Sequence, residues 1–140
     1  MNQTKLLVSC TEYFSFLKNI PPCDVFQSFT RSGLIPTILD THATFPEADL
    51  TFYMGMIDGI MALENDADES PYKNYEARIR LLNAVLLKLG TAKRCTAADA
   101  CTLYYTSALG HLVSDETSGY YEKSVDEILQ LLQEELDSKA

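Results

Sequence analysis

The fold class is decided by the stretch PYKNYEARIRLLNAVLLKLG at residues 71–90. Its apolar side chains recur at alternating intervals of four and three residues, at Tyr75, Ile79, Leu82, Leu86 and Leu89. These intervals place the side chains on one face of an α-helix. Pro71 suits the first turn of a helix, and Gly90 is a typical stop signal. We therefore predict a helix that buries one face.

The same start, stripe and stop signals recur along the chain, while no stretch alternates as a β-strand would. They predict helices near residues 4–19 and 22–32, a short helix or turn at 34–41, a helix that opens at Thr96, and a last helix that opens at Ser124 or earlier, near Ser118. The fold class we expect is all-α, a compact bundle of about six or seven helices. Residues 1–140 would form a single domain, with a possible subdivision into 1–63 and 71–140 across an acidic linker at 64–70.

One segment, near residues 47–63, is predicted to be the central helix of the bundle. Residues Thr44 and Glu47 have the spacing of a capping box, with Pro46 in the first turn. The sequence LTFYMGMIDGIMAL that follows at 50–63 is apolar nearly all round, which is typical of a buried helix. Gly55 and Gly59 lie one turn apart, so a neighbouring helix is expected to approach closely there.

The chain is acidic, and the charge is unevenly distributed. Its formal net charge is −9, and residues 115–140 contain eight acids against two bases. Such a balance disfavours direct binding of nucleic acid, where affinity comes from Lys and Arg. We find no signal-peptide pattern and no apolar stretch long enough to span a bilayer. The expectation is a soluble, cytoplasmic protein that binds no membrane.

No motif with a chemical mechanism emerges, so we predict no catalytic residue, no cofactor and no metal. The four cysteines fit no zinc spacing and are expected to be reduced and mostly buried. Asp66, Asp68 and Ser70 have calcium-loop spacing, but the required Gly and Glu are absent. His42 and His111 have no partner at catalytic spacing, and only a polar pocket around either would favour an enzyme.

Acidic and tyrosine side chains towards the end of the chain provide the functional candidates. Neighbouring helix positions point about 100° apart, so one member of each pair Tyr104-Tyr105 and Tyr120-Tyr121 should be exposed or lie at a rim. The acids are either a solvated face that pairs with the basic helix around Lys73, Arg78 and Arg80, or a surface for a basic partner. The candidate partner surface consists of Asp115, Glu116, Tyr120, Glu122, Asp126, Glu127, Glu134 and Asp137.

A set of helix-packing positions in the first 63 residues also resembles a known family. The set comprises Cys10-Thr11-Glu12-Tyr13, Val25, Phe26, Phe29, Gly33, Leu34, Ile35, Ile38, Leu39 and Ile57-Asp58. They resemble a family of small, uncharacterised helical bacterial domains found in predicted toxin–antitoxin loci, beside ADP-ribosyltransferase-like toxins. The family tends to have His-Thr where this chain has Thr41-His42. The resemblance implies a helical fold and no catalytic residues.

These observations predict a non-catalytic, acidic protein-binding module of antitoxin or inhibitor type, rather than an enzyme. Its partner would be a protein with a basic surface. The alternative is a phage-type inhibitor that imitates nucleic acid, such as an anti-CRISPR or other anti-defence protein, and occupies the basic groove of a nuclease. A homodimer is also possible, because the stripe at residues 75–89 resembles a heptad pattern.

Overall fold

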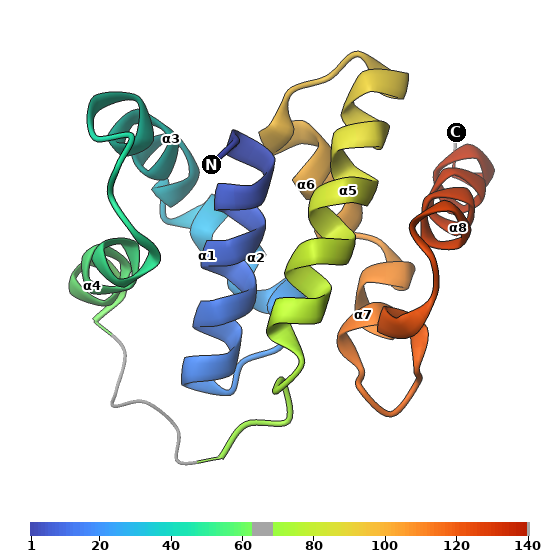
Figure 1. Cartoon of the computed structure of the whole chain (residues 1–140), viewed down its shortest axis with the longest axis horizontal. Helices are drawn as coiled ribbons and strands as arrows, with labels where there is room; N and C mark the ends of the chain where they lie inside the picture. Colours follow the sequence, from blue (N-terminus) through green and yellow to red (C-terminus); the bar gives the residue numbers. More distant parts are fainter. Residues whose placement is uncertain (63–68, 140) are drawn as a thin grey trace.

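Eight α-helices, one short 3-10 helix and no strand make up residues 1–62 and 69–139, the part of the chain that the computed structural model describes (Figure 1). The helices are α1 (Gln3–Lys18), α2 (Pro22–Arg31), α3 (Leu34–Thr44), α4 (Leu50–Met61), α5 (Tyr75–Lys93), α6 (Ala97–Tyr105), α7 (Ala108–Ser114), η1 (Tyr120–Glu122) and α8 (Val125–Ser138). The prediction of an all-α bundle is confirmed, with eight helices rather than six or seven.

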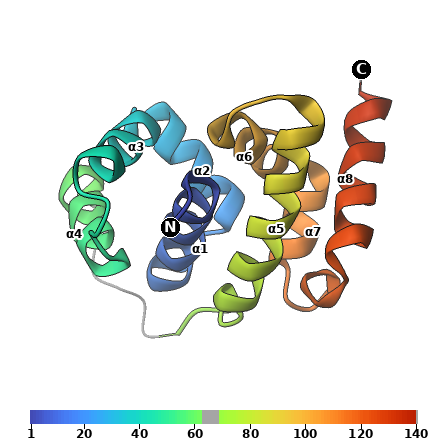
Figure 2. The same cartoon turned by 45° about the horizontal axis from the view of Figure 1, so that its top comes forward.

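The centre of the bundle is α1, which packs against α2, α3, α4, α5 and α6. Figure 2 shows it between the α3–α4 side of the molecule and the α5–α8 side. Consecutive residues such as Leu6, Leu7 and Val8 are all buried, so α1 is covered on several faces. Its partner α5 contributes the predicted stripe, in which Ile79, Leu82, Leu86 and Leu89 are buried within the chain's own core.

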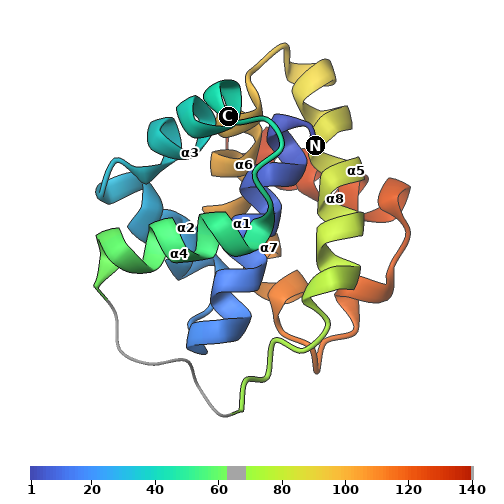
Figure 3. The ribbon, with the colours of Figure 1, turned by 60° about the vertical axis from the view of Figure 1, so that its left-hand side comes forward.

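The prediction that the helix near 47–63 is central is wrong. Helix α4 lies at the edge of the molecule and crosses α1 on the outside (Figure 3). Only Tyr53, Met54 and Ile57 are buried on it, whereas Gly55 and Gly59 are exposed. A Cβ atom built on either glycine meets nothing within 4 Å, so no helix of the described ranges approaches there. An apolar composition shows that a helix can be buried, but not that the chain supplies a cover for every face.

Helix starts follow the capping residues in most places. The side chains of Asn2, Thr96 and Ser124 accept hydrogen bonds from backbone N–H groups three residues on, as N-caps do. The starts predicted at Thr96 and Ser124 are therefore confirmed. The capping box predicted at Thr44 is wrong, because Thr44 is the last residue of α3 and Asp49 caps α4 instead, through a 3.0 Å bond from the N–H of Phe52.

Helix ends follow the sequence less closely. Helix α5 continues through Gly90 and ends at Lys93, followed by the C-cap Arg94, whose φ of 53° is left-handed. The N–H of Cys95 then donates to the carbonyl of Gly90 at 3.0 Å. The helix predicted to open at Thr96 is divided into α6 and α7, because the Ser107 hydroxyl accepts from the N–H of Gly110 at 3.0 Å and so starts α7 as a new helix. This division adds one helix to the predicted number.

The predicted acidic linker at 64–70 lies outside the described residues except for Glu69 and Ser70, and so do Asp66 and Asp68 of the calcium-loop spacing. On either side of it, α1 and α5 lie against each other, so helices from before and after the segment share one core. None of the helices in the described part of the chain combines the length and the hydropathy that crossing a membrane would require.

Candidate functional site

The acidic end of the chain forms the outermost helix on one side of the molecule. Helix α8 packs on α5 through Ile128 and Leu132, both buried (Figure 1). Its other face points to solvent and carries Asp126, Glu134 and Asp137. These positions lie at i, i+8 and i+11, so at the usual 100° and 1.5 Å per residue the carboxylates spread over about 80° of the helix surface and about 16 Å of its length. We call these three side chains the acidic row.

Two of these acids pair with lysines of α5. Asp126 lies 3.4 Å from Lys88 and Asp137 lies 3.9 Å from Lys93. The aspartate side chains are nevertheless 87% and 77% exposed, and exposed ion pairs of this kind contribute at most about 1 kcal/mol. The row therefore stays accessible to a basic partner even though α5 partly balances its charge.

The remaining candidates take up several local roles. Glu122 is exposed in η1, while Tyr120 is half-buried with Lys123 above its ring at 5.2 Å. The carboxylate of Glu127 accepts from the Ser124 hydroxyl at 3.2 Å, and the N–H of Glu127 donates to the same hydroxyl, which caps the start of α8. Asp115 accepts two hydrogen bonds from Thr117, and these lower the pKa of its carboxyl.

Glu116 belongs to a charge cluster in the interior rather than to the acidic row. Its carboxylate pairs with Arg78 and accepts from the backbone N–H of Asn74 at 2.7 Å. Arg78 is fully buried and also donates from Nε to Glu12 of α1 at 2.6 Å. Tyr105 donates its hydroxyl to the second oxygen of Glu12 at 2.7 Å. We call Glu12, Arg78, Tyr105 and Glu116 the buried charge cluster.

The electrostatics of the buried charge cluster favour a charged Arg78. Burial acts to lower the pKa of the guanidinium, but the carboxylates of Glu12 and Glu116 outweigh it, and the pKa is raised. For Tyr105, burial raises the pKa, so its hydroxyl stays protonated and donates to Glu12. With every member bonded to another, the cluster joins α1, α5 and α6 in a defined arrangement.

The sequence prediction for Tyr104 and Tyr105 is wrong, because both are fully buried. They lie at the end of α6, and α6 packs against α1, α2, α5 and α7, so more than one of its faces is covered. The two rings are 4.8 Å apart in an edge-to-face arrangement. Tyr120 and Tyr121 are both half-buried, as residues at a rim are.

Glu135 has a role that the sequence did not reveal. Its carboxylate accepts hydrogen bonds from the N–H groups of Ala108 and Leu109, at 2.8 and 2.9 Å, and from Lys139 at 2.8 Å. An acid on α8 thus caps the start of α7 from 26 or more residues away, where the helix dipole favours a negative charge. Partial burial acts to raise the pKa of Glu135, but these hydrogen bonds outweigh it, and the pKa is lowered.

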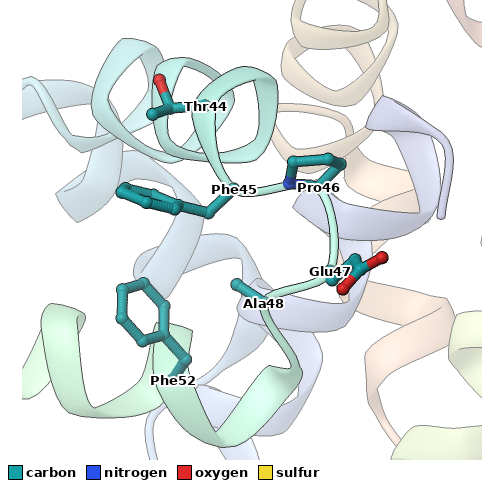
Figure 4. Close-up of a pocket in the computed structure, with 6 residues that line it drawn as sticks. All are labelled: Thr44, Phe45, Pro46, Glu47, Ala48 and Phe52. Carbon is teal, nitrogen blue, oxygen red and sulfur yellow. The ribbon is translucent and has the colours of Figure 1, made fainter.

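A second surface lies on the opposite side of the molecule, where α3 turns into α4. A cavity of about 520 Å³ opens there between the rings of Phe45 and Phe52 (Figure 4). Its lining consists of Thr44, Phe45, Pro46, Glu47, Ala48 and Phe52. The capping-box spacing of Thr44 and Glu47 predicted the start of a buried helix here and gave no sign of a surface.

A smaller cavity of about 390 Å³ includes His111, Cys23, Tyr72 and Glu116 in its lining. Burial raises the pKa of the Cys23 thiol to about 12, so Cys23 stays protonated at neutral pH and is a poor nucleophile. Glu116 is already engaged by Arg78. This cavity therefore places a histidine beside groups that are held in other interactions. Nowhere in the described ranges do three or more His, Cys, Asp or Glu side chains gather as a metal site would need.

All four cysteines are free thiols, as predicted. Cys10, Cys23 and Cys101 are buried, and burial raises the pKa of the Cys10 and Cys101 thiols to about 12 as well. Cys95, at the turn between α5 and α6, is half-buried. The thiols thus divide into three that the core covers and one near the surface.

Comparison with known proteins gives no match: no protein-family model fits the chain, and no curated protein or solved structure is significantly similar to it. The resemblance to the toxin–antitoxin family stays a prediction.

Proposed function

We propose that the protein is a non-catalytic, acidic protein-binding module of antitoxin or inhibitor type, which acts in the cytoplasm on a partner with a basic surface. The observation that carries the proposal is the row of carboxylates along the solvent face of α8. Asp126 and Asp137 in this row are more than three-quarters exposed. Charges arranged in this way accelerate association with an oppositely charged surface.

The other features support the same proposal. The partial resemblance of residues 1–63 to domains of toxin–antitoxin loci favours a small protein that neutralises another protein. Each member of the buried charge cluster is bonded to another member, so we assign the cluster a structural role in holding the helices together. Binding through an exposed row needs no rearrangement of this interior.

The test is a capture experiment with the full chain from a native lysate of its source, repeated at several salt concentrations. A triple variant with Asp126, Glu134 and Asp137 changed to Lys should lose the captured partner, and the wild-type complex should weaken as salt rises. A control with Asp24, Glu76 and Asp99 changed to Lys alters the net charge equally on other exposed helix positions. Equal capture by both variants would reject the acidic row as the partner surface.

The alternative function, an inhibitor that imitates nucleic acid, is favoured by the linear arrangement of the same row. Mimicry requires carboxylates spread along one face, which α8 provides over about 16 Å. The distinguishing measurement is competition: DNA should displace the chain from its partner if the row occupies a nucleic-acid groove. A complex that is indifferent to DNA but sensitive to salt favours the antitoxin type.

A further inference from the structure

The corner between α3 and α4 exposes large apolar side chains that nothing in the described chain covers. Phe45 is 60% exposed, Phe52 is 48% exposed and Ile60 is 50% exposed. Phe52, Gly55, Gly59 and Ile60 are exposed on α4. Phe45 lies beside Phe52, in the connection to α3 (Figure 4). We call these five residues together with Ala48 the α3–α4 surface. Contiguous exposed apolar surface of this kind marks interaction sites.

The cavity in the α3–α4 surface is held open by its own backbone. The N–H of Phe45 donates to the carbonyl of Thr41 at 2.7 Å, and the N–H of Ala48 donates to the carbonyl of Phe45 at 3.0 Å. Phe52 is supported from behind by an edge-to-face contact with the buried Tyr53, with ring centres 5.7 Å apart. Figure 4 shows both phenylalanine rings on the same side of the connecting segment. A bulky apolar side chain could enter between them without rearrangement of the backbone.

The two glycines of α4 allow a helix to approach this face. Both are exposed, and a Cβ atom on either would meet nothing within 4 Å, so the packing of the described residues gives no reason for them. Each is less favourable than alanine in a helix interior. Small residues one turn apart let the backbone of a second helix lie close.

The charges around the surface select the kind of helix that fits. Residues 32–62 contain the acids Asp40, Glu47, Asp49 and Asp58 and no Lys or Arg. Glu47 lines the cavity itself, while Asp58 pairs with Lys18 of α1 at 3.1 Å. In a symmetric contact between two copies the same acids would meet one another, which disfavours a homodimer here. A cationic rim on the partner would meet them favourably.

We propose that the α3–α4 surface binds an amphipathic helix that carries Lys and Arg beside an apolar face. A bulky apolar residue of that helix enters between Phe45 and Phe52, its backbone crosses Gly55 and Gly59, and its cations face Asp40 and Glu47. The binding mode is a helix laid in an apolar groove. The surface lies on the opposite side of the molecule from α8 (Figures 1 and 2) and shares no residue with the acidic row, so either proposal can fail alone.

The test uses a fluorescently labelled Leu/Lys peptide of about four helical turns and measures its anisotropy with the full chain. We expect the peptide to bind. Binding should be lost when each Lys of the peptide is replaced by Glu, or when the order of its residues is scrambled. Changing Phe45 and Phe52 to Ala should weaken binding about tenfold or more. A matched control with Leu87 and Leu112 changed to Ala removes exposed leucines from α5 and α7 and should keep the wild-type affinity.

Charge reversal completes the test. Changing Asp40 and Glu47 to Lys should weaken the peptide complex about threefold to tenfold at low salt and less at high salt. The triple α8 variant should bind the peptide normally. The proposal is overturned if the Phe45/Phe52 variant binds as the control does, if the Leu/Glu peptide binds equally, or if the α8 variant alone abolishes binding. A dimer in sedimentation experiments that the Phe52 change abolishes would assign the surface to a second copy instead.

Discussion

At the scale of single residues, we expect changes in the buried charge cluster to lower the free energy of unfolding strongly. Arg78 and Glu12 are both inaccessible to solvent, so neither can lose its partner without a buried charge left over. Changing Arg78 to Met should lower the free energy of unfolding by about 3–5 kcal/mol, measured by urea denaturation.

The matched double variant identifies the cause of that loss. If Glu12 is changed to Gln together with Arg78 to Met, the orphaned charge disappears and part of the stability should return. Two losses that simply add in the double variant would show that the two side chains do not interact energetically.

Glu135 predicts how stability depends on pH. Its pKa is lower in the folded chain than in the unfolded chain, so the carboxylate stabilises the start of α7. This contribution is fully present above the unfolded pKa of about 4.3 and is lost as the pH falls through the folded pKa. A Glu135→Gln variant should therefore be less stable than wild type at pH 7 but differ little at pH 3. Thermal melting across that range checks it, and an unchanged gap at low pH would contradict it.

At the scale of helices, α4 is less stable than it would be with alanine in place of its two exposed glycines. Changing Gly55 or Gly59 to Ala should raise the free energy of unfolding by about 0.5–1 kcal/mol each, because both are helical and have open space around a new Cβ. Gly110 is the contrasting control, since its Cβ would lie 2.7 Å from the carbonyl oxygen of Tyr104. Chemical denaturation of the three variants should show two gains and one loss. A loss at Gly55 or Gly59 would show that α4 is covered.

The helices also show what could be predicted from the sequence. Local signals such as the caps at Thr96 and Ser124 and the stripe of α5 act within a few residues, so they could be read directly. The ends at Asn19, Ala62 and Arg94 use left-handed residues that are not glycine, and no sequence rule predicted them. The bond from Arg78 to Glu12 joins positions 66 apart, and the edge position of α4 depends on which helices meet. These features arise from tertiary packing, which local patterns do not encode.

For the candidate site, the sequence predicted the acids near the end of the chain, but not which of them are exposed and which bond to other helices. Asp126, Glu134 and Asp137 lie on the exposed face as a surface requires. Glu116 turned inward because Arg78 and Asn74 meet it there, and Glu135 turned to α7. Similar side chains in one acidic segment therefore differ through the partners that folding brings to them.

At the scale of the whole molecule, the packing of α1 on α5 should make the chain unfold as one unit. Changing Leu82, fully buried on α5, to Ala should cost about 2–5 kcal/mol and destabilise both halves together. Circular dichroism and tyrosine fluorescence should then report one coincident transition. Two separate transitions would instead support the predicted division into 1–63 and 71–140.

Because the four thiols differ in burial, their rates of alkylation should report how often the core opens. An alkylating reagent under native conditions should mark Cys95 first, because only that thiol is partly exposed. Cys10, Cys23 and Cys101 should gain mass only when the helices above them separate, each at the rate of the opening that uncovers it. The three buried thiols on α1, α2 and α6 would thus give the local opening rate of each helix without an added probe.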